Sequence, residues 1–367
     1  MMDYRLKNLA NILVNYSLAV KPGDWVIINS NLIATPLINE IVCAILDAGG
    51  NYNLMLSSDD INETFYHHAN DAQTQWISPL DTLIHEKADA SISILGATNT
   101  RALTGTDPRK QAARGVARRG LMQQFMERSA QGSLRWSVVQ YPCPAFAQEA
   151  DMSLSDYENF VYGACYADQN DPVAKWRAIH DEQAKLVDWL KGKEQVIVRG
   201  PNIDLSLSIK DRTFINACGD RNMPDGEIFT GPVEESVNGW VRFSYPALRG
   251  GMEVDGVEFK FENGKVVQAT AKKNQDYLFT QLDSDGGARY LGEFAIGTNF
   301  GIQKFTKNIL FDEKIGGTLH MAVGAGYPET GSKNKSAVHW DFICDMRHES
   351  EVLVDGELFY KNGAFQV

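Results

Sequence analysis

The sequence contains no apolar run near the roughly 18 residues that a membrane-spanning helix needs. It has no Cys-x-x-Cys pair, and its five cysteines are scattered and odd in number, which argues against a disulfide framework and a zinc–cysteine site. The N-terminal stretch is amphipathic, carries charge in its first turns and does not resemble a secretory signal. We therefore expect a cytoplasmic protein with reduced cysteines and no membrane partner.

Positive charge is also in short supply. The net charge is -12, whereas binding to phosphates needs a concentrated basic surface, so nucleic acid is not an expected partner. No serine lies in a Gly-x-Ser-x-Gly elbow and no cysteine has an activating histidine nearby, so we do not expect a side-chain nucleophile. The segment from Gly326 to Lys333 resembles a phosphate loop only with its last two residues reversed, and we reject a nucleotide site.

The pattern of apolar residues changes near residue 193. Before this point, strands such as Trp25 to Asn29 and Ala90 to Leu95 alternate with helices, which is typical of a parallel sheet covered on both faces. After it, short alternating strands dominate, and Asn263-Gly264 predicts a tight hairpin turn. The sequence thus predicts an α/β N-terminal domain (1–193) with a mainly parallel sheet, followed by a β-rich α+β C-terminal domain (194–367).

Two histidines and three carboxylates lie in apolar, glycine-broken segments of the second domain. Glu227 occurs in NMPDGEIFTG and Glu293 in LGEFAIG, while His320, His339 and Asp341 lie between Leu319 and Asp345. Acidic side chains seldom have such apolar surroundings unless they are paired or bound to a metal. The spacing of His339 and Asp341 places both side chains on one face of a strand. Together the five are a full ligand set for one or two divalent ions that activate water.

A structural interpretation of the same residues is also open. The two glutamates could be strand-end carboxylates satisfied by backbone amides, and the two histidines could be core residues. That interpretation is reasonable for any one of them, but the occurrence of all five in one domain favours a metal centre. Three carboxylates against two imidazoles favour a pair of hard or borderline ions bridged by a carboxylate.

Three longer motifs carry a family resemblance. The stretches NMPDGEIFTGPVEESVNGWVRF, LGEFAIGTN and LHMAVGAGYPETGSKNKSAVHWD resemble the thermophilic aminopeptidase family of metallopeptidases, which includes aminopeptidase T and aminopeptidase S. The resemblance covers nearly the whole chain. It implies a cytoplasmic, homodimeric exo-aminopeptidase with two divalent metal ions (Zn, Co, Mn or Mg) in the C-terminal, catalytic domain, acting on peptides with a free N-terminus.

When the family's motifs are matched to this sequence, five residues correspond to the family's metal ligands and one tyrosine corresponds to its catalytic tyrosine. The expected ligands are Glu227, Glu293, His320, His339 and Asp341, and the catalytic tyrosine is Tyr327. Between the two glutamates, we assign Glu293 to proton transfer and Glu227 to bridging the ions. Two alternatives stay open: a non-catalytic metal- or peptide-binding protein on the same scaffold, and another binuclear hydrolase such as an amidase or esterase. The N-terminal domain would serve dimerisation or shape the substrate cleft.

Overall fold

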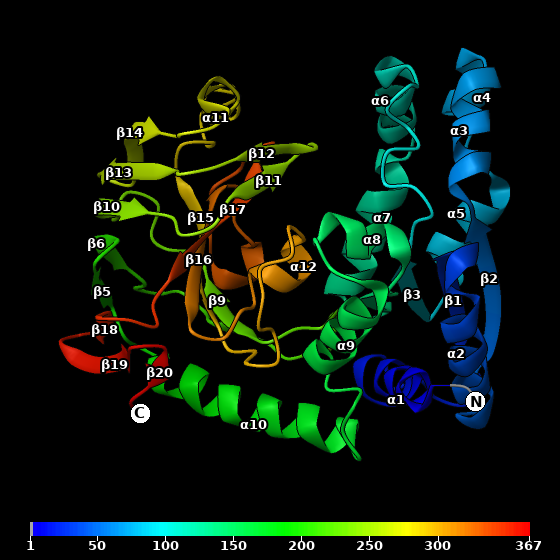
Figure 1. Ribbon diagram of the computed structural model, residues 1–367, viewed down its shortest axis with the longest axis horizontal. Helices are drawn as coiled ribbons and strands as arrows, with labels where there is room; N and C mark the ends of the chain where they lie inside the picture. The colour runs from blue at the N-terminus through cyan, green and yellow to red at the C-terminus, as the bar shows by residue number, and fades with distance from the viewer. Residues whose placement is uncertain (1–2) are drawn as a thin grey trace. The chain divides into compact units, whose positions relative to one another are not determined.

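The computed structural model describes residues 3–367, which form two compact units (Figure 1). The first unit runs to Lys175 and also includes Gly219–Pro224, and the second comprises Trp176–Cys218 and Asp225–Val367. The first unit therefore ends earlier in the chain than the predicted boundary at residue 193. The reason is helix α10 (Pro172–Leu190), which contributes Leu186 and Leu190 to the hydrophobic core of the second unit.

The first unit is built on a parallel five-stranded sheet, as predicted. Its strand order is β2-β1-β3-β4-β8, and all four pairings are parallel. The strands are β1 (Trp25–Asn31), β2 (Asn51–Ser57), β3 (Ala90–Leu95), β4 (Arg135–Gln140) and β8 (Asn222–Met223). The short β8 lies in Gly219–Pro224, the later segment of the chain that belongs to the first unit. The sequence pattern did not indicate this strand.

Helices connect these strands, and several begin at clear capping signals. Asp107, for example, accepts a hydrogen bond from the backbone amide of Arg109 and starts α6, with Pro108 in its first turn. The helical segments of this unit are α1 (Tyr4–Ile12), the π-helix η1 (Leu13–Ser17), η2 (Leu32–Ala34), α2 (Thr35–Asp47), α3 (Asp59–His68), α4 (Asp71–Gln75), α5 (Pro79–Lys87), α6 (Pro108–Ala117), α7 (Arg119–Ala130), α8 (Pro144–Glu149) and α9 (Leu154–Ala164).

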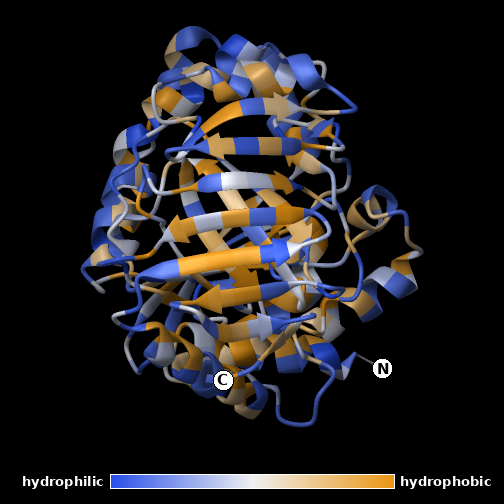
Figure 2. Cartoon of the chain, turned by 90° about the vertical axis from the view of Figure 1, so that its left-hand side faces the viewer, coloured by the Kyte–Doolittle hydropathy of each residue, from blue (hydrophilic) through white to orange (hydrophobic). Residues whose placement is uncertain are grey.

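The second unit contains an eight-stranded antiparallel sheet, which faces the viewer in Figure 2. Its order is β14-β13-β10-β6-β5-β18-β19-β20. The strands are β5 (Gln195–Gly200), β6 (Ile203–Ser208), β10 (Asn238–Arg242), β13 (Glu258–Glu262), β14 (Lys265–Thr270), β18 (Glu351–Val354), β19 (Glu357–Lys361) and β20 (Ala364–Phe365). Asn263 and Gly264 join β13 to β14 with φ angles of 50° and 83°, the left-handed conformation that the predicted tight turn requires.

A second antiparallel sheet of five strands packs against this one and carries the functional residues. Its order is β17-β16-β15-β9-β7. The strands are β7 (Ile215–Ala217), β9 (Glu227–Thr230), β15 (Leu291–Gly297), β16 (Thr318–Gly324) and β17 (His339–Asp345). Residues of both sheets form one hydrophobic core. The remaining elements are β11 (Ala247–Arg249), β12 (Met252–Val254), α11 (Gln275–Leu282), α12 (Ile309–Asp312) and η3 (Pro328–Thr330).

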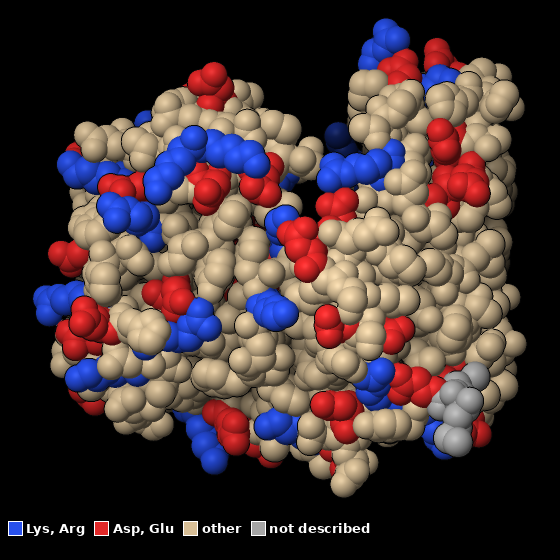
Figure 3. Space-filling view, viewed as in Figure 1, with Lys and Arg blue, Asp and Glu red and all other residues tan. Residues whose placement is uncertain are grey.

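The surface carries charges of both signs. On the face shown in Figure 3, the acidic and basic side chains are interspersed rather than gathered by sign. None of the helices within residues 3–367 combines the length and the apolar character that crossing a bilayer requires.

Candidate metal centre

Alternation along four neighbouring strands gathers the predicted site residues on one face of the five-stranded sheet. On β16, Leu319, Met321 and Val323 belong to the hydrophobic core, so His320 and Ala322 point to the opposite face. The same alternation applies to β9, to β17 and to β15 from Glu293 onward, after an irregularity between Leu291 and Glu293. It brings Glu227, Glu293, His320, His339 and Asp341 to this face.

Two alanines lie among these residues in the strand register. Ala322 pairs with Glu293 on one side and with Asp341 on the other. Ala295 pairs with His320, and both alanines are fully buried. A methyl group is the smallest side chain that an L-residue can place there, so the register leaves room between the longer polar side chains around it.

The two imidazoles face different oxygens of the same carboxylate. Nε2 of His320 lies 3.5 Å from Oε1 of Glu293, and Nε2 of His339 lies 3.3 Å from Oε2. Each imidazole has a second carboxylate neighbour: Glu227 Oε2 is 3.3 Å from His320, and Asp341 Oδ1 is 3.5 Å from His339. Glu293 is thus the centre of the cluster and has one oxygen directed to each half.

The other ring nitrogen of each histidine is fixed by a backbone carbonyl. Nδ1 of His320 donates to the carbonyl oxygen of Glu313 at 2.8 Å, and Nδ1 of His339 donates to that of Ala325 at 2.7 Å. This arrangement orients the imidazole and leaves Nε2 for the cluster, which is how histidines that bind metals are usually held. Glu227 is also held through its backbone, because its carbonyl accepts a hydrogen bond of 2.9 Å from buried Gln183 on α10.

The oxygen atoms of the cluster fit a cation. Within residues 3–367, Oε2 of Glu227 and Oδ1 of Asp341 are buried and have no hydrogen-bond partner. Buried carboxylate oxygens without a partner are costly unless a cation neutralises them. Backbone amides therefore do not satisfy Oε2 of Glu227, although the structural interpretation of the sequence required this of that glutamate. The donor atoms of Glu227, Glu293 and His320 lie within 4.8 Å of one another, and those of Glu293, His339 and Asp341 do so as well.

Protonation in the metal-free protein reflects the same geometry. Burial opposes the charged form of both imidazoles, but the hydrogen bond with Glu293 and the neighbouring carboxylates raise the pKa of His320 and of His339 to about 10. Burial would raise the pKa of Glu293, yet the same two histidines lower it to about 2. Burial raises the pKa of Asp341 to about 6, although the charge of His339 lowers it. Burial also raises the pKa of Glu227 well above its usual range. Without metal, protons on the imidazoles balance part of the negative charge.

Tyr327 lies at the edge of the cluster. Its ring centroid is 5.2 Å from that of His339 and 5.4 Å from that of Phe229. The side chain is 38% exposed, so the ring borders the cluster while remaining accessible. Burial and the neighbouring carboxylates raise the pKa of its hydroxyl, which therefore keeps its proton and can donate a hydrogen bond.

The structure adds a carboxylate that the sequence interpretation missed. A donor oxygen of Glu313 lies within 4.8 Å of the donor atoms of His320 and Asp341. Glu313 follows the short helix α12, and its carboxylate is paired with the buried ammonium of Lys314. A signal was present, because an Asp-Glu-Lys run follows the apolar Ile309–Phe311. Glu313 thus shares with Glu227 and Glu293 the apolar sequence surroundings by which those two glutamates were predicted as ligands.

Comparison with known families identifies a metalloprotease family for this chain. The family described as thermophilic metalloprotease (M29) matches residues 2–365. The chain belongs to this metalloprotease family. The resemblance seen in the sequence motifs is thereby confirmed.

Relatives within the metalloprotease family carry aminopeptidase names. Aminopeptidase 2 of Geobacillus stearothermophilus is 27% identical over 96% of this chain and 94% of its own length. Aminopeptidase T of Thermus thermophilus is 28% identical over 75% of this chain and 73% of its own length. The solved structure of wild-type AmpT from Thermus thermophilus aligns with a TM-score of 0.85 over 99% of both chains at 23% identity, which supports the fold.

In this metalloprotease, the segment that links Tyr327 to His339 is fastened by carboxylates outside the cluster. Asp285 Oδ2 accepts hydrogen bonds from the hydroxyl of Ser336 at 2.8 Å and the amide of Ala337 at 2.7 Å. Its Oδ1 accepts from the amides of Gly287 and Ala288 in its own turn. Asp285 thus connects this turn to the segment that leads directly into β17 and His339.

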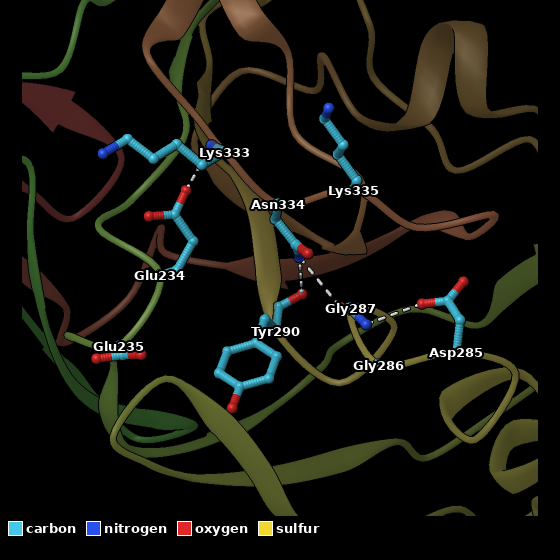
Figure 4. Close-up of a pocket in the computed structure, with 9 residues that line it drawn as sticks. All are labelled: Glu234, Glu235, Asp285, Gly286, Gly287, Tyr290, Lys333, Asn334 and Lys335. Atoms are coloured by element: carbon cyan, nitrogen blue, oxygen red, sulfur yellow. Dashed lines mark hydrogen bonds between the residues drawn. The ribbon is translucent and has the colours of Figure 1, made fainter.

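A second carboxylate fastens the other half of the linking segment (Figure 4). Glu234 Oε1 accepts a hydrogen bond of 2.6 Å from the amide of Lys333. The Asn334 side chain donates to the carbonyl of Gly287 at 3.0 Å. These contacts border an open pocket of about 570 Å³ lined by Glu234, Glu235, Asp285, Gly286, Gly287, Tyr290, Lys333, Asn334 and Lys335.

Proposed function

We propose that this protein is a metal-dependent aminopeptidase that releases N-terminal amino acids from peptides at a site for two divalent cations. The observation that carries the proposal is the position of Glu293, whose two oxygens face two different imidazoles. Membership of the metalloprotease family and the aminopeptidase names of the relatives support the reaction.

The cluster divides into two sets of donors that share Glu293. Glu227, His320 and Oε1 of Glu293 would hold one ion, and His339, Asp341 and Oε2 of Glu293 would hold the other. Mixed oxygen and nitrogen donors suit Zn, Co, Mn and Mg to different degrees. When bound, such ions act as Lewis acids that make water nucleophilic near neutral pH.

The geometry favours exchanging the roles that the sequence gave to the two glutamates. A carboxylate with each oxygen directed at a different imidazole is suited to bridging, and that carboxylate belongs to Glu293. Glu227 has one imidazole neighbour, and its Oε2 has no hydrogen-bond partner. We therefore assign proton transfer from water to the leaving amine to Glu227, and the bridging position to Glu293.

Tyr327 completes the proposed site from its edge. Its hydroxyl would donate a hydrogen bond to the oxyanion that develops on the scissile carbonyl, an interaction worth about 3 kcal/mol when it is well aimed. A carboxylate of the site or one of the ions it holds would bind the free α-amine of the substrate, which would restrict the reaction to the first residue of a peptide.

Assembly and location are parts of the same proposal. We propose a homodimer, which is supported by large apolar side chains that the first unit exposes. They include Ile61, Trp76, Val116, Met122 and Met126, each between 55% and 64% exposed. Where such side chains form a contiguous patch, the patch commonly marks a protein interface. All five cysteines are free, which supports a reducing compartment such as the cytoplasm.

Hydrolysis of aminoacyl-p-nitroanilides tests the reaction. The purified protein is stripped with chelator and resupplied separately with Zn, Co, Mn or Mg, and an N-blocked version of each substrate serves as control. We expect activity that disappears on stripping, returns with metal and is absent on blocked substrates. Bound metal without any cleavage would favour the non-catalytic binding protein, and cleavage of blocked amides or esters would favour a different binuclear hydrolase.

A further inference from the structure

Phe229 shares one face of the five-stranded sheet with the proposed metal centre. In β9, Ile228 belongs to the hydrophobic core, so Glu227 and Phe229 on either side of it point to the opposite face. Phe229 pairs with Ala295, and Ala295 pairs on its other side with His320. In this row of the sheet, the side chain between the Phe229 ring and the His320 imidazole is therefore a single methyl group.

Solvent reaches this face on the two sides of the cluster and not over its central strands. Every residue of β15 and β16 is buried, whereas Phe229 is the one residue of β9 that is only half-buried. On the other side of the cluster, the His339 side chain is 29% exposed. A substrate that approaches from solvent would therefore meet Phe229 on one side and His339 on the other.

The ring of Tyr327 contacts both of these accessible positions. Its centroid is 5.4 Å from that of Phe229 on β9 and 5.2 Å from that of His339 on β17. Between β9 and β17 in the sheet lie β15 and β16, which carry Glu293 and His320. Phe229 therefore lies against the tyrosine whose hydroxyl we propose as the donor to the scissile carbonyl.

A second apolar side chain extends this surface away from the cluster. Ile215 of β7 is the cross-strand partner of Phe229 and is also half-buried. Directly opposite residues of an antiparallel pair lie on the same face of the sheet. Neither side chain can form a hydrogen bond, so a polar group placed against them would lose water without compensation. An apolar group would gain from the same contact.

We propose that Phe229 and Ile215 receive the side chain of the first residue of the substrate and give the enzyme a preference for large apolar first residues. This inference rests on the proposed function. The first side chain leaves the carbon atom between the α-amine and the scissile carbonyl. Once the ions and Tyr327 hold those two groups, the side chain must lie beside Tyr327, where Phe229 is the apolar neighbour. Phe229 would then be a specificity-determining residue.

A basic first residue is the main alternative, because aromatic rings attract cations. The charge of the loaded cluster opposes it. Glu227, Glu293 and Asp341 carry three negative charges against the four positive charges of two divalent ions. The carboxylate of Glu313 is balanced by the ammonium of Lys314. The remaining positive charge would repel a lysine or arginine side chain at this short range, whereas an apolar side chain would not experience it.

Hydrolysis of Leu-, Phe-, Ala-, Lys- and Glu-p-nitroanilide by the Co²⁺-loaded full chain tests the preference. We expect kcat/KM for the Leu and Phe substrates to exceed that for the Ala substrate about tenfold or more. Phe229→Ala should lower the Leu and Phe values about tenfold and leave the Ala value within about threefold. Equal values for all five substrates, or a preference for Lys, would overturn the inference and leave the proposed function standing. If none is cleaved, the proposed function fails and this inference fails with it.

Three further variants separate recognition from structure. Phe229→Leu keeps an apolar side chain and should retain most of the preference. Ile215→Ala should lower the Leu and Phe values by a smaller factor than Phe229→Ala does. Phe365→Ala is the matched control, because Phe365 is a half-buried aromatic residue of β20 in the other sheet, and its selectivity should equal that of the wild type.

Calorimetric titration of each chelator-treated variant with Co²⁺ shows whether the metal centre is intact. We expect the constants of Phe229→Ala to match those of the wild type, since Phe229 supplies no donor atom. If this variant weakens Co²⁺ binding, or lowers kcat/KM for all five substrates equally, the role of Phe229 is structural and the inference fails. Circular dichroism verifies folding, and if Phe229→Ala does not fold, the wild-type panel and Ile215→Ala decide.

Discussion

Ala322 lies directly across from Asp341 in the ladder between β16 and β17. On its other side it pairs with Glu293, so its methyl group occupies the space between two of the proposed ligands. The replacement Ala322→Val should weaken Co²⁺ binding about 5- to 150-fold, since overpacking a buried position costs about 1–3 kcal/mol. Calorimetric titration measures the change.

Ala322→Gly is the matched control for this prediction. It removes bulk from the same position and should retain Co²⁺ binding, at a cost in stability of about 0.5–1 kcal/mol for a glycine within a strand. If Ala322→Val binds both ions as the wild type does, the small residue has no spacing role.

Metal binding should release protons and tighten as the pH rises. Although burial opposes their charge, the hydrogen bond with Glu293 and the nearby carboxylates raise the pKa of His320 and of His339 to about 10, so near neutral pH both imidazoles carry a proton that a cation must displace. Calorimetry in buffers of different ionisation enthalpy should report the release of about two protons. Release of none would show that the imidazoles are not ligands.

The same shift gives the metal-free protein a pH-dependent stability. Because the folded pKa of each histidine lies above its value of 6.5 in the unfolded chain, the stabilisation is complete below about pH 6.5 and is lost as the pH rises towards 10. The Tm of the chelator-treated protein should therefore fall over this interval. The Tm of the metal-loaded protein should fall less, since its imidazoles are neutral throughout.

Some of this site follows from local sequence alone. His339 and Asp341 share a face because they are two residues apart on a strand, and Glu227 and Glu293 were recognisable as acids in apolar segments. The parallel sheet of the first unit followed from its alternation of strands and helices. In each case the deciding pattern lies within a few neighbouring residues.

Other features depend on how distant segments meet. Glu313 comes to the cluster from the end of α12, and its carbonyl orients His320 seven residues further along. The bridging position proposed for Glu293 depends on the register of β15 with β16, which shifts at an irregularity between Leu291 and Glu293. Register across a sheet is set by pairing and not by local pattern, so the sequence could not separate the roles of the two glutamates.

Glu293→Gln tests the bridging assignment. The amide retains the shape of the side chain but removes the charge shared by the two imidazoles, so both Co²⁺ steps should weaken about 100-fold or more and turnover should be lost. Glu258→Gln, at a half-buried position of β13 outside the cluster where the carboxylate pairs with Arg242, is the control and should bind metal as the wild type does. If Glu293→Gln retains both ions and loses only turnover, Glu293 is the proton carrier that the sequence suggested.

Tyr327→Phe separates catalysis from metal binding. Loss of an oxyanion donor lowers kcat about 100-fold or more in other enzymes, and the variant should do the same while KM and both Co²⁺ constants stay near those of the wild type. The ring contacts with His339 and Phe229 need no hydroxyl, so the fold should not change. A kcat within about threefold of the wild type would remove Tyr327 from the reaction.

Asp285→Asn addresses how the segment between Tyr327 and His339 is held. The two carboxylate oxygens of Asp285 accept four hydrogen bonds, two from Ser336 and Ala337 and two from its own turn. An asparagine has only one acceptor oxygen, because its other terminal group is a donor, so it can keep one of these two pairs of hydrogen bonds but not both. We expect a loss of about 1–3 kcal/mol in unfolding free energy. We also expect kcat to fall about tenfold, since small displacements of catalytic groups are costly. Asp283→Asn, in the same turn but paired with Arg289, provides the comparison. Equal behaviour of the two variants would mean that the carboxylate of Asp285 does not position the site.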